Sequence, residues 1–552
     1  MRSTSDFLVA SRRVSPLLNS AAVSGEYLSA ASFLGVSGLV VKDGIGALWY
    51  PVGFTAGYIA MLALVAAPMR RSGALTVPDF AEARLASPPL RRLAAVTILV
   101  IGGLYLIPQF RTAGLVLSVV SGTPYWVGVV IAGVAVSGSL ALGGMRAATY
   151  VQAFQFCLKL VLFIVPAIWL LLRVGPEVRD EAMHPVEFTT FSHDTPVSFR
   201  SAVTLDIREP VTIGTAEGRT YVNPGEFQVA AGSTLVFPDG SPVPGVRGQT
   251  PPGGPGWERP LIPDEDQPLL ATWAVLLATM LGTMGLPHVL MRFHTSPNGR
   301  AARKTAALTV VLLSAFYLFP GIYGVLGRVL VPQLYLSGAT DTAVVALPYQ
   351  VDQGPWGDAF TALLTAGAFA AFLATSLGLL LVVSGAISHD LLAGGLRQLR
   401  VTVILAAAAV VLLALPAARM DANTLVTWGF TVAASTFSPL LVLGIWWSRL
   451  TAPGAIAGVT VGLLATAGSI AGSLWGPPVH GWVAILVAQP APWSVPLAFG
   501  TMVVVSLFGR PPAWAPAAML RLHLPESDLD HSTGDADRSS TVRRMVRRFV
   551  RD

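Results

Sequence analysis

A run of polar side chains interrupts the first long apolar stretch of the sequence. Residues 24–35 read Ser-Gly-Glu-Tyr-Leu-Ser-Ala-Ala-Ser-Phe-Leu-Gly, within an apolar stretch from about residue 16 to residue 41. Polar groups at bilayer depth usually face a bundle interior or a water-filled cavity. Small residues between them let the backbone loosen, so that carbonyls become free to bind a cation. The plain alternative is that Gly, Ala and Ser only permit close helix packing, but the carboxylate of Glu26 favours an interrupted, functional helix.

A second group of oxygen ligands is found much later in the chain. Residues 371–378 read Ala-Phe-Leu-Ala-Thr-Ser-Leu-Gly, and Thr375 and Ser376 place two adjacent hydroxyls at the middle of an apolar stretch. Isolated hydroxyls of this kind usually bond to a carbonyl of their own helix. Facing a broken first helix, however, they would add hard oxygen ligands of the type that a small cation accepts.

Two basic side chains lie inside apolar stretches. Arg111 calls for a carboxylate partner at that depth, and both Glu26 and the carboxylate of a solute are candidates. The alternatives are a structural ion pair and a side chain that extends to the membrane interface. Lys159 raises the same question with a weaker signal.

Other polar residues give little support to catalysis. Three residues at the end of the sixth apolar stretch are interpreted as gate or loop contacts and not as ligands: His288, Arg292 and His294. The sequence shows no metal-ligand cluster, nucleophile elbow or phosphate-binding glycine loop. We therefore expect a transporter and not an enzyme.

The composition indicates an all-α polytopic membrane protein. Of 552 residues, 53% are hydrophobic and 12% charged, against about 25% charged in soluble domains. About twelve stretches are long enough to span a bilayer: 16–41, 45–67, 93–120, 124–143, 147–174, 268–290, 304–330, 357–388, 399–417, 422–447, 453–476 and 493–509. The single Cys157 excludes an intrachain disulfide, and the net charge of +6 lies next to the spans, which argues against nucleic-acid binding.

The basic residues predict an orientation. Arg and Lys are concentrated in alternate connections, which places both termini in the cytoplasm and the protein in the plasma membrane. Arg2, Asp6, Arg12 and Arg13 precede the first span without the short apolar region of a cleavable signal peptide.

The spans divide into two sets of five with two more after them. Because five is odd, the second set would run inverted relative to the first, a plan of many secondary transporters. The matching interruption in span 6 is residues 281–288, Leu-Gly-Thr-Met-Gly-Leu-Pro-His. The expected regions are a cytoplasmic segment 1–15, spans 1–5 in 16–174, an exterior insertion at 175–267, spans 6–10 in 268–450, spans 11 and 12 in 451–510, and a cytoplasmic tail at 511–552.

Two regions lie outside the spans. The insertion alternates apolar and polar residues between turn signals such as Pro238-Asp239-Gly240, which predicts a small β-rich or partly disordered element. The tail is expected to be disordered and to end in a basic amphipathic helix at 542–551 suited to anionic lipid, or in a solvated charged end.

Several ordered blocks resemble the sodium:solute symporter family and, within it, the cation/acetate (monocarboxylate) symporters. The blocks are 26–35, 143–147, 150–152, 285–293, 301–304, 387–391, 447–451 and 521–526. The resemblance covers nearly all of the chain except the insertion and the distal tail. It implies a five-plus-five inverted-repeat, LeuT-like core and alternating access driven by Na⁺.

The resemblance also implies a sodium site. The family's first-span carbonyls fall on Gly25 and Leu28, its eighth-span carbonyl on Ala371, and one of its two hydroxyls on Thr375. The other hydroxyl position holds Ala374, a departure that Ser376 could compensate or that indicates another driving ion. Members usually carry one more helix ahead of the stretch matching residues 6–12, so we expect either an upstream start codon or a branch without that helix.

The sequence therefore predicts Na⁺-coupled symport of a small monocarboxylate such as acetate. Five residues are expected to line the solute site: Glu26, Tyr27, Ser29, Arg111 and Thr283. The alternatives are another solute (proline, a sugar or pantothenate), coupling to H⁺, or a membrane sensor.

Overall fold

The computed structural model describes residues 4–524, except 186, 200, 216, 217, 264–266, 393, 420, 421 and 478. Within this part of the chain, ten helices are long and apolar enough to cross a membrane. The predicted all-helical membrane class is confirmed. The basic helix predicted at 542–551 lies outside the described residues.

The first half of the bundle contains a broken first helix and a bent fourth one. Its elements are α1 (Thr4–Val9), a 3₁₀ turn at Ala10–Arg12, α2 (Pro16–Tyr27), a π-helix η2 (Ala31–Gly35), α3 (Val36–Asp43), a 3₁₀ turn η3 (Ile45–Leu48), α4 (Trp49–Leu64), α5 (Ala66–Ser72), α6 (Val77–Leu85), α7 (Pro88–Ser121) and α8 (Tyr125–Arg173). Gly144 has φ 54° and ψ −162°, a conformation that interrupts α8. This break divides α8 into the two predicted spans 124–143 and 147–174, and a glycine accepts it without a Cβ clash.

The second half repeats the broken first helix. Its elements are α11 (Pro268–Gly285), α12 (Pro287–His294), α13 (Gly299–Tyr317), α14 (Pro320–Leu330), α15 (Gln333–Ser337), η4 (Thr340–Thr342), α16 (Ala343–Val351), α17 (Pro355–Gly385), a π-helix η5 (Ala386–Leu391), α18 (Leu396–Ala414), η6 (Pro416–Arg419) and α19 (Ala422–Trp446). The helices α20 (Ala452–Trp475), α21 (Gly481–Ala488), α22 (Ala491–Phe508) and α23 (Ala515–His523) follow. The tail predicted to be disordered from residue 511 thus contains α23, which is held by a 2.9 Å hydrogen bond from Arg71 Nη1 to the carbonyl of His523.

The segment between α8 and α11 forms a small antiparallel β-element. It comprises α9 (Pro176–Met183), β1 (Thr195–Ser198), β2 (Val203–Ile207), β3 (Val211–Thr215), β4 (Gly218–Val222), β5 (Gly225–Val229), β6 (Thr234–Phe237), β7 (Gly245–Val246) and α10 (Pro255–Glu258). The strand orders are β1-β6-β3-β4 and β5-β2-β7. Arg328 on α14 anchors this element through hydrogen bonds to Thr189 Oγ1 (2.6 Å) and the carbonyl of Glu181 (2.5 Å).

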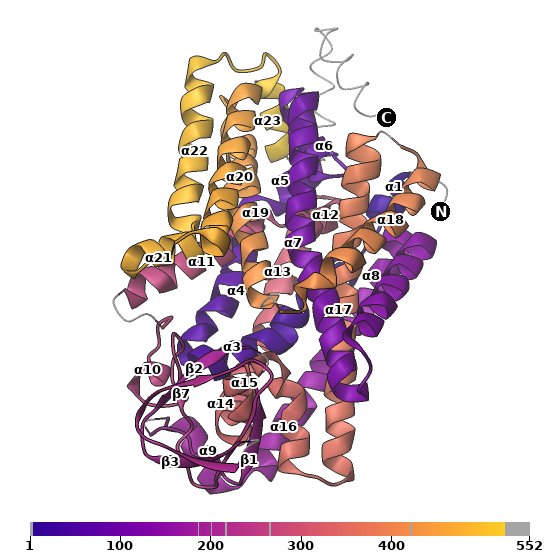
Figure 1. Cartoon of the computed structure of the whole chain (residues 1–552). Helices are drawn as coiled ribbons and strands as arrows, with labels where there is room; N and C mark the ends of the chain where they lie inside the picture. Colours follow the sequence, from indigo (N-terminus) through magenta and orange to yellow (C-terminus); the bar gives the residue numbers. More distant parts are fainter. Residues whose placement is uncertain are drawn as a thin grey trace.

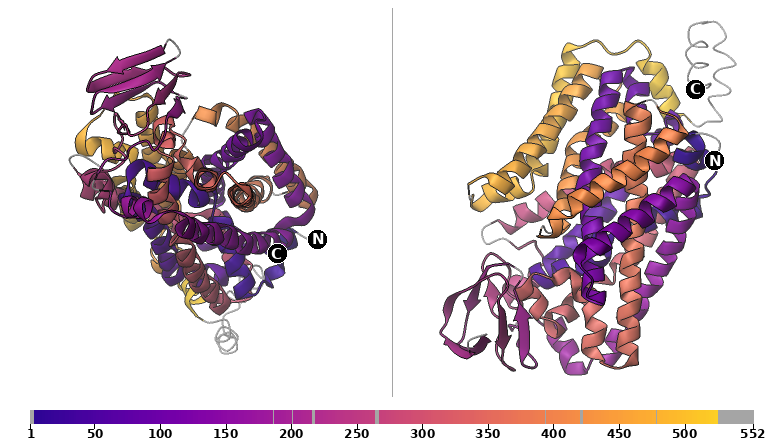
Figure 2. Two further views of the ribbon diagram at one scale, coloured as in Figure 1. Left: turned by 90° about the horizontal axis from the view of Figure 1, so that it is seen from below. Right: turned by 45° about the vertical axis from the view of Figure 1, so that its right-hand side comes forward.

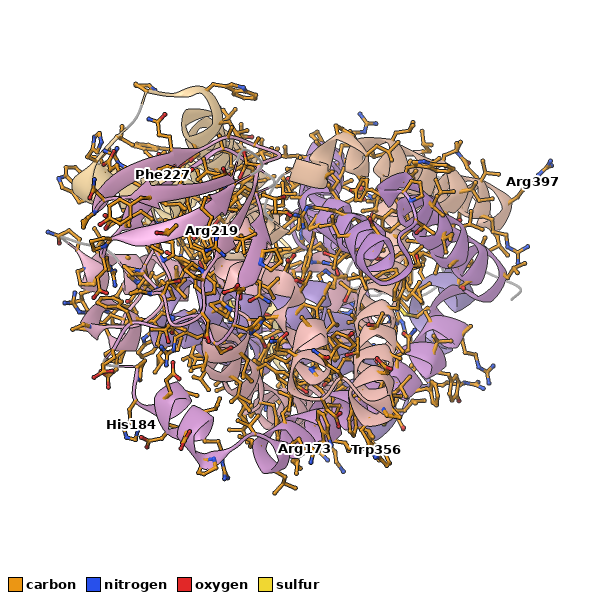
Figure 3. All side chains as sticks on the ribbon, turned by 60° about the horizontal axis from the view of Figure 1, so that its bottom comes forward. Arg173, His184, Arg219, Phe227, Trp356 and Arg397 are labelled. Carbon is orange, nitrogen blue, oxygen red and sulfur yellow. The ribbon has the colours of Figure 1, made fainter. Side chains whose placement is uncertain are left out.

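The β-element lies at one end of the bundle, and α1 and α23 lie toward the other end (Figures 1 and 2). Figure 3 looks onto the β-element end, with Arg219 and Phe227 on its strands and Arg173 and Trp356 among the neighbouring helix ends.

Candidate functional site

The helix break between α2 and η2 leaves backbone carbonyls without their usual helical partners. Leu28 has ψ 76°, outside the helical region. The amide of Ser29, which would bond to the carbonyl of Gly25 in a continuous helix, instead donates to the carbonyl of Tyr27 at 2.7 Å. The matching break between α11 and α12 lies at Leu286, where ψ is 117° and Pro287 begins the next helix. Both predicted interruptions are therefore present.

A buried ion pair joins the two broken helices. Arg292 Nε on α12 lies 2.5 Å from Glu26 Oε2 on α2, and both side chains are almost fully buried. The guanidinium also donates to Thr149 Oγ1 at 2.8 Å and to Gln152 Oε1, both on α8. A buried ion pair is stable only when its remaining polar atoms also have hydrogen-bond partners, and Thr149 and Gln152 on α8 supply them here.

A glycine of α17 makes room for this carboxylate. A Cβ at Gly378 would lie 1.7 Å from Glu26 Oε1, so no larger residue fits while the carboxylate stays in place. The position of the ion pair is thus defined by four elements: α2, α8, α12 and α17.

The structure gives each of the two arginines an acidic partner. Arg292 is not a peripheral gate contact but the counter-charge of Glu26 in the interior. For Arg111 the candidates were Glu26, the carboxylate of a solute and a structural ion pair, and its Nη1 lies 3.7 Å from Asp341 Oδ2 on η4, as in the third of these. A signal for Arg292 was available in the sequence, because it follows the Pro287 break by five residues and falls one to two turns into the second broken helix.

Lys159 takes two of the carbonyls that the resemblance assigns to sodium. Its Nζ, on the second part of α8, donates to the carbonyls of Gly25 at 2.5 Å and Leu28 at 2.7 Å. The residue has no exposed surface. Sequence reasoning noted Lys159 without assigning it to this position.

The expected hydroxyl ligands face the same break. Thr375 Oγ1 on α17 donates to the carbonyl of Glu26 at 2.5 Å. Ser376 Oγ is buried and has no hydrogen-bond partner among the described residues. Gln152 Nε2 donates to the carbonyl of Ala374 at 2.6 Å, and Ala371 is buried one turn earlier on α17.

Two of the predicted solute residues are in direct contact. Tyr27 Oη and Thr283 Oγ1 are 2.8 Å apart and connect α2 to α11. The Tyr27 ring packs edge-on against Tyr58, with centroids 4.9 Å apart. Ser29 Oγ lies at a longer distance of 3.5 Å from Tyr105 Oη. The break is therefore lined by phenol groups contributed by three helices.

Several polar atoms around the break are buried and have no partner among the described residues. They are Tyr58 Oη, Gln109 Nε2 and the two ring nitrogens of His288, of which a neutral imidazole offers one as a donor. Gln109 is held at the break because its Oε1 accepts the amide of Ala30 at 3.2 Å, and the His288 ring packs edge-on to Tyr105 at 5.5 Å. Buried donors without partners are uncommon and call for an explanation such as a ligand or water.

A separate acidic cluster lies where α6 meets η5. Ligand atoms of Asp79, His389 and Asp390 lie within 4.8 Å of one another. Arg91 already supplies the positive charge there, with Nη2 2.9 Å from Asp79 and 3.0 Å from Asp390. Burial raises the pKa of Asp79, but the His389 hydrogen bond and the charges of His389 and Arg91 outweigh it and hold that pKa below its ordinary value. We interpret the cluster as a structural clamp.

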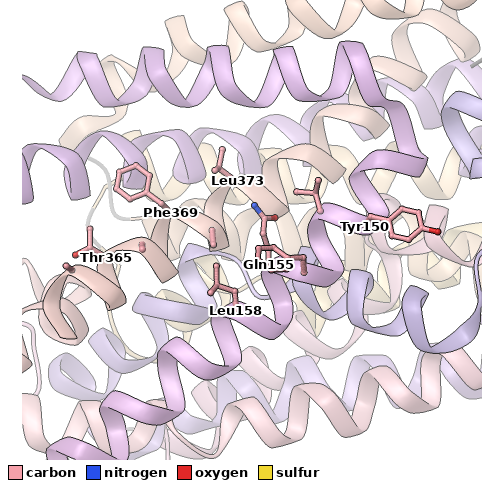
Figure 4. Close-up of a pocket in the computed structure, with 11 residues that line it drawn as sticks. Tyr150, Gln155, Leu158, Thr365, Phe369 and Leu373 are labelled. Carbon is pink, nitrogen blue, oxygen red and sulfur yellow. The ribbon is translucent and has the colours of Figure 1, made fainter. Parts of the chain in front are cut away.

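An apolar groove lies between α8 and α17 (Figure 4). Gln155, Leu158, Phe369 and Leu373 line it. Tyr150 and Phe154, which also line it, are 56% and 68% exposed. The groove is open to the surroundings and mainly apolar, so we assign it to the lipid-facing surface.

Comparisons with solved structures show the fold. A Na⁺-coupled sialic acid symporter in its substrate-bound outward-open state has a TM-score of 0.63 at 13% identity, with 93% of each chain covered. MhsT in complex with L-phenylalanine has a TM-score of 0.54 at 14% identity, covering 88% of this chain and 98% of the other. Mhp1, a nucleobase-cation-symport-1 family transporter in a closed conformation with bromovinylhydantoin bound, has a TM-score of 0.53 at 12% identity, covering 94% and 99%. The fold is LeuT-like.

The sequence model of the sodium:solute symporter family matches residues 7–216 and 266–462, well over half of the chain. This match and the fold indicate a multi-pass membrane transporter that performs secondary active symport, and the family implies sodium as its coupling ion. The chain belongs to the sodium:solute symporter family.

Proposed function

We propose that the protein transports a small monocarboxylate, such as acetate, by alternating access. The observation that carries the proposal is a set of buried groups around the helix breaks that can donate a hydrogen bond and have no partner among the described residues: Tyr58 Oη, Gln109 Nε2 and the N–H of the His288 ring. A carboxylate has only acceptor oxygens when ionised and can satisfy several donors at once. The aromatic rings around these donors leave an apolar environment for a short alkyl group.

The two helix breaks are the proposed site of movement. The Glu26–Arg292 pair ties α2 to α12, so the two broken helices can move together against α8 and α17. We assign Tyr27, Ser29 and Thr283 to the solute site and the Glu26–Arg292 pair to its support. We place the solute entrance at the β-element end. The ion pair between Arg111 and Asp341 would favour the state in which this entrance is closed.

The proposed orientation follows the charge rule of the connections. The β-element would face the exterior of the plasma membrane, and the end that carries α1 and α23 would face the cytoplasm. Solute would then enter from the β-element end and leave at the opposite end.

The sodium ligands expected from the resemblance are Gly25, Leu28, Ala371, Thr375 and Ser376. The donor set found at this position does not fit a sodium ion. Lys159 Nζ bonds to the first two carbonyls, and Thr375 Oγ1 bonds to the carbonyl of Glu26.

Solute counterflow tests the proposed solute. Purified protein in proteoliposomes loaded with unlabelled acetate should take up external labelled acetate without any ion gradient, because exchange needs only the alternating site. Unlabelled propionate should compete, whereas proline, glucose and pantothenate should not. Exchange of one of those three solutes without exchange of acetate would replace the monocarboxylate by that solute.

Replacing Tyr27 with Phe should weaken solute binding. It removes the 2.8 Å bond to Thr283 Oγ1, and losing one such bond costs about 0.5–1.5 kcal/mol. We expect the half-saturating acetate concentration in counterflow to rise by about 2–10-fold, since 1.4 kcal/mol corresponds to tenfold. Tyr221→Phe is the matched control, because Tyr221 is exposed on β4. An unchanged value in Tyr27→Phe would remove Tyr27 from the solute site.

A further inference from the structure

The position of Lys159 departs from the expected cation site in a specific way. Its Nζ lies 2.5 Å and 2.7 Å from the carbonyls of Gly25 and Leu28, which the break in α2 exposes. Among the described residues, no carboxylate lies within 4.0 Å of this ammonium. The charge of Lys159 is therefore met by backbone dipoles, as the charge of a small cation would be at a broken helix.

A free cation cannot share these oxygens with the ammonium. Two positive charges on the same pair of carbonyls would repel each other strongly in a water-excluded interior. Few other oxygen ligands remain for a cation. Ala374 supplies no hydroxyl, and among the hydroxyls of the candidate ligands in the described part of the chain only that of Ser376 has no hydrogen-bond partner. Lys159 and a sodium ion are alternatives at this position.

We infer that the ammonium of Lys159 takes the place of the coupling sodium ion in this chain, so that solute transport is independent of Na⁺. This inference rests on the proposed symport. A tethered ammonium differs from Na⁺ in one respect: it cannot leave with the solute.

The ammonium also connects two helices. Its charge-assisted hydrogen bonds to the carbonyls of Gly25 and Leu28 tie α2 to α8, and such bonds are roughly twice as strong as neutral ones. A free Na⁺ at these carbonyls would bind and leave as its concentration changes, whereas the ammonium holds the break with and without Na⁺.

Other charged groups near α8 do not supply this function. On α2 the acid is Glu26, which Arg292 neutralises, and on α7 Arg111 faces Asp341. The remaining charged residues on described elements that pack against α8 are at or near element ends: Asp6, Arg12, Arg91, Arg92, Asp358, Arg397 and Arg400. Lys159 is thus the group at the break whose charge is not already neutralised by an ion pair.

Thermal unfolding of the purified full chain tests the replacement without reference to any solute. The unfolding temperature of the wild type should be the same in NaCl and in N-methylglucamine chloride. The double variant Lys159→Ala with Ala374→Ser frees both carbonyls and restores a hydroxyl, so it should acquire a saturable stabilisation by Na⁺. Lys304→Ala, an exposed lysine on α13, should behave as the wild type does. Saturable stabilisation of the wild type by Na⁺ would overturn the inference, even if the double variant failed to fold.

Transport by proteoliposomes tests the independence from Na⁺. Acetate counterflow should be equal in NaCl and in N-methylglucamine chloride, and an inward Na⁺ gradient should not drive accumulation of labelled acetate. Lys159→Ala should lose at least tenfold of the counterflow measured without Na⁺. Accumulation driven by a Na⁺ gradient in the wild type would overturn the inference and leave the symport in place. Absence of counterflow with every solute would instead refute the proposed function, and the Na⁺ response in thermal unfolding would still decide the role of Lys159.

Discussion

Replacing Arg292 with Met should destabilise the protein by about 3–5 kcal/mol, because it leaves a buried carboxylate without its counter-charge. Arg292 has no exposed surface and lies 2.5 Å from Glu26 Oε2. Its loss also removes the donor to Thr149 Oγ1. We expect a low yield and loss of acetate counterflow. We also expect a lower midpoint of urea unfolding, measured by tryptophan fluorescence in detergent.

The double variant Glu26→Gln with Arg292→Met is the matched control. It removes both charges, so most of the stability lost in Arg292→Met should return, while transport should not because α2 and α12 are no longer joined. Glu26→Gln alone should be destabilised, since it leaves the guanidinium buried without an anion. Equal stability of Arg292→Met and the wild type would contradict the buried ion pair.

The sequence predicted the parts of the site that depend on local composition. Polar and small residues at 24–35 predicted the break that the structure has at Leu28, and the Gly-Pro run at 281–288 predicted the break at Leu286. A break is a local property, because it depends on residues that weaken a helix at that point. Alternation of apolar and polar residues likewise indicated strands in the insertion, but not the pairing of β1 with β6 across the whole element.

The partners of the charged side chains could not be read from the sequence. Glu26 and Arg292 are 266 positions apart, and their pairing requires α2, α8, α12 and α17 to meet at one point. Arg111 was the more obvious candidate, since it lies deeper in its apolar stretch, yet it faces Asp341. Lys159 reaches the carbonyls of α2 only because α8 turns at Gly144 and packs against α2 along its second part.

These contacts suggest why the expected cation site differs while the family and fold are retained. A site made of backbone carbonyls needs only a break in the helix and a cation of suitable size, so a lysine on a neighbouring helix can supply the charge without altering the break. The missing hydroxyl at Ala374 and the presence of Lys159 then have one explanation. Where the ammonium bonds to the carbonyls of Gly25 and Leu28, the additional oxygen ligand is not required.

Replacing Gly25 with Ala should separate α2 from α8. A Cβ at this position would lie 2.2 Å from the carbonyl oxygen of Gln152, a backbone atom that cannot swing aside. Overpacking of this kind costs about 1–3 kcal/mol, and the required shift also moves the carbonyl of Gly25 away from Lys159 Nζ. We expect a lower unfolding temperature and a fall in acetate counterflow of about tenfold or more, since 1.4 kcal/mol corresponds to tenfold.

Gly138→Ala is the control for the loss of a helical glycine. It lies on the first part of α8, where a Cβ would meet no atom within 4 Å, so Ala should be neutral or stabilise the helix by up to about 1 kcal/mol. Wild-type stability and uptake in both variants would show that α2 and α8 are not in such close contact at Gly25. A loss confined to Gly25→Ala would tie transport to this contact, because the two substitutions add the same methyl group and differ only in what that group meets.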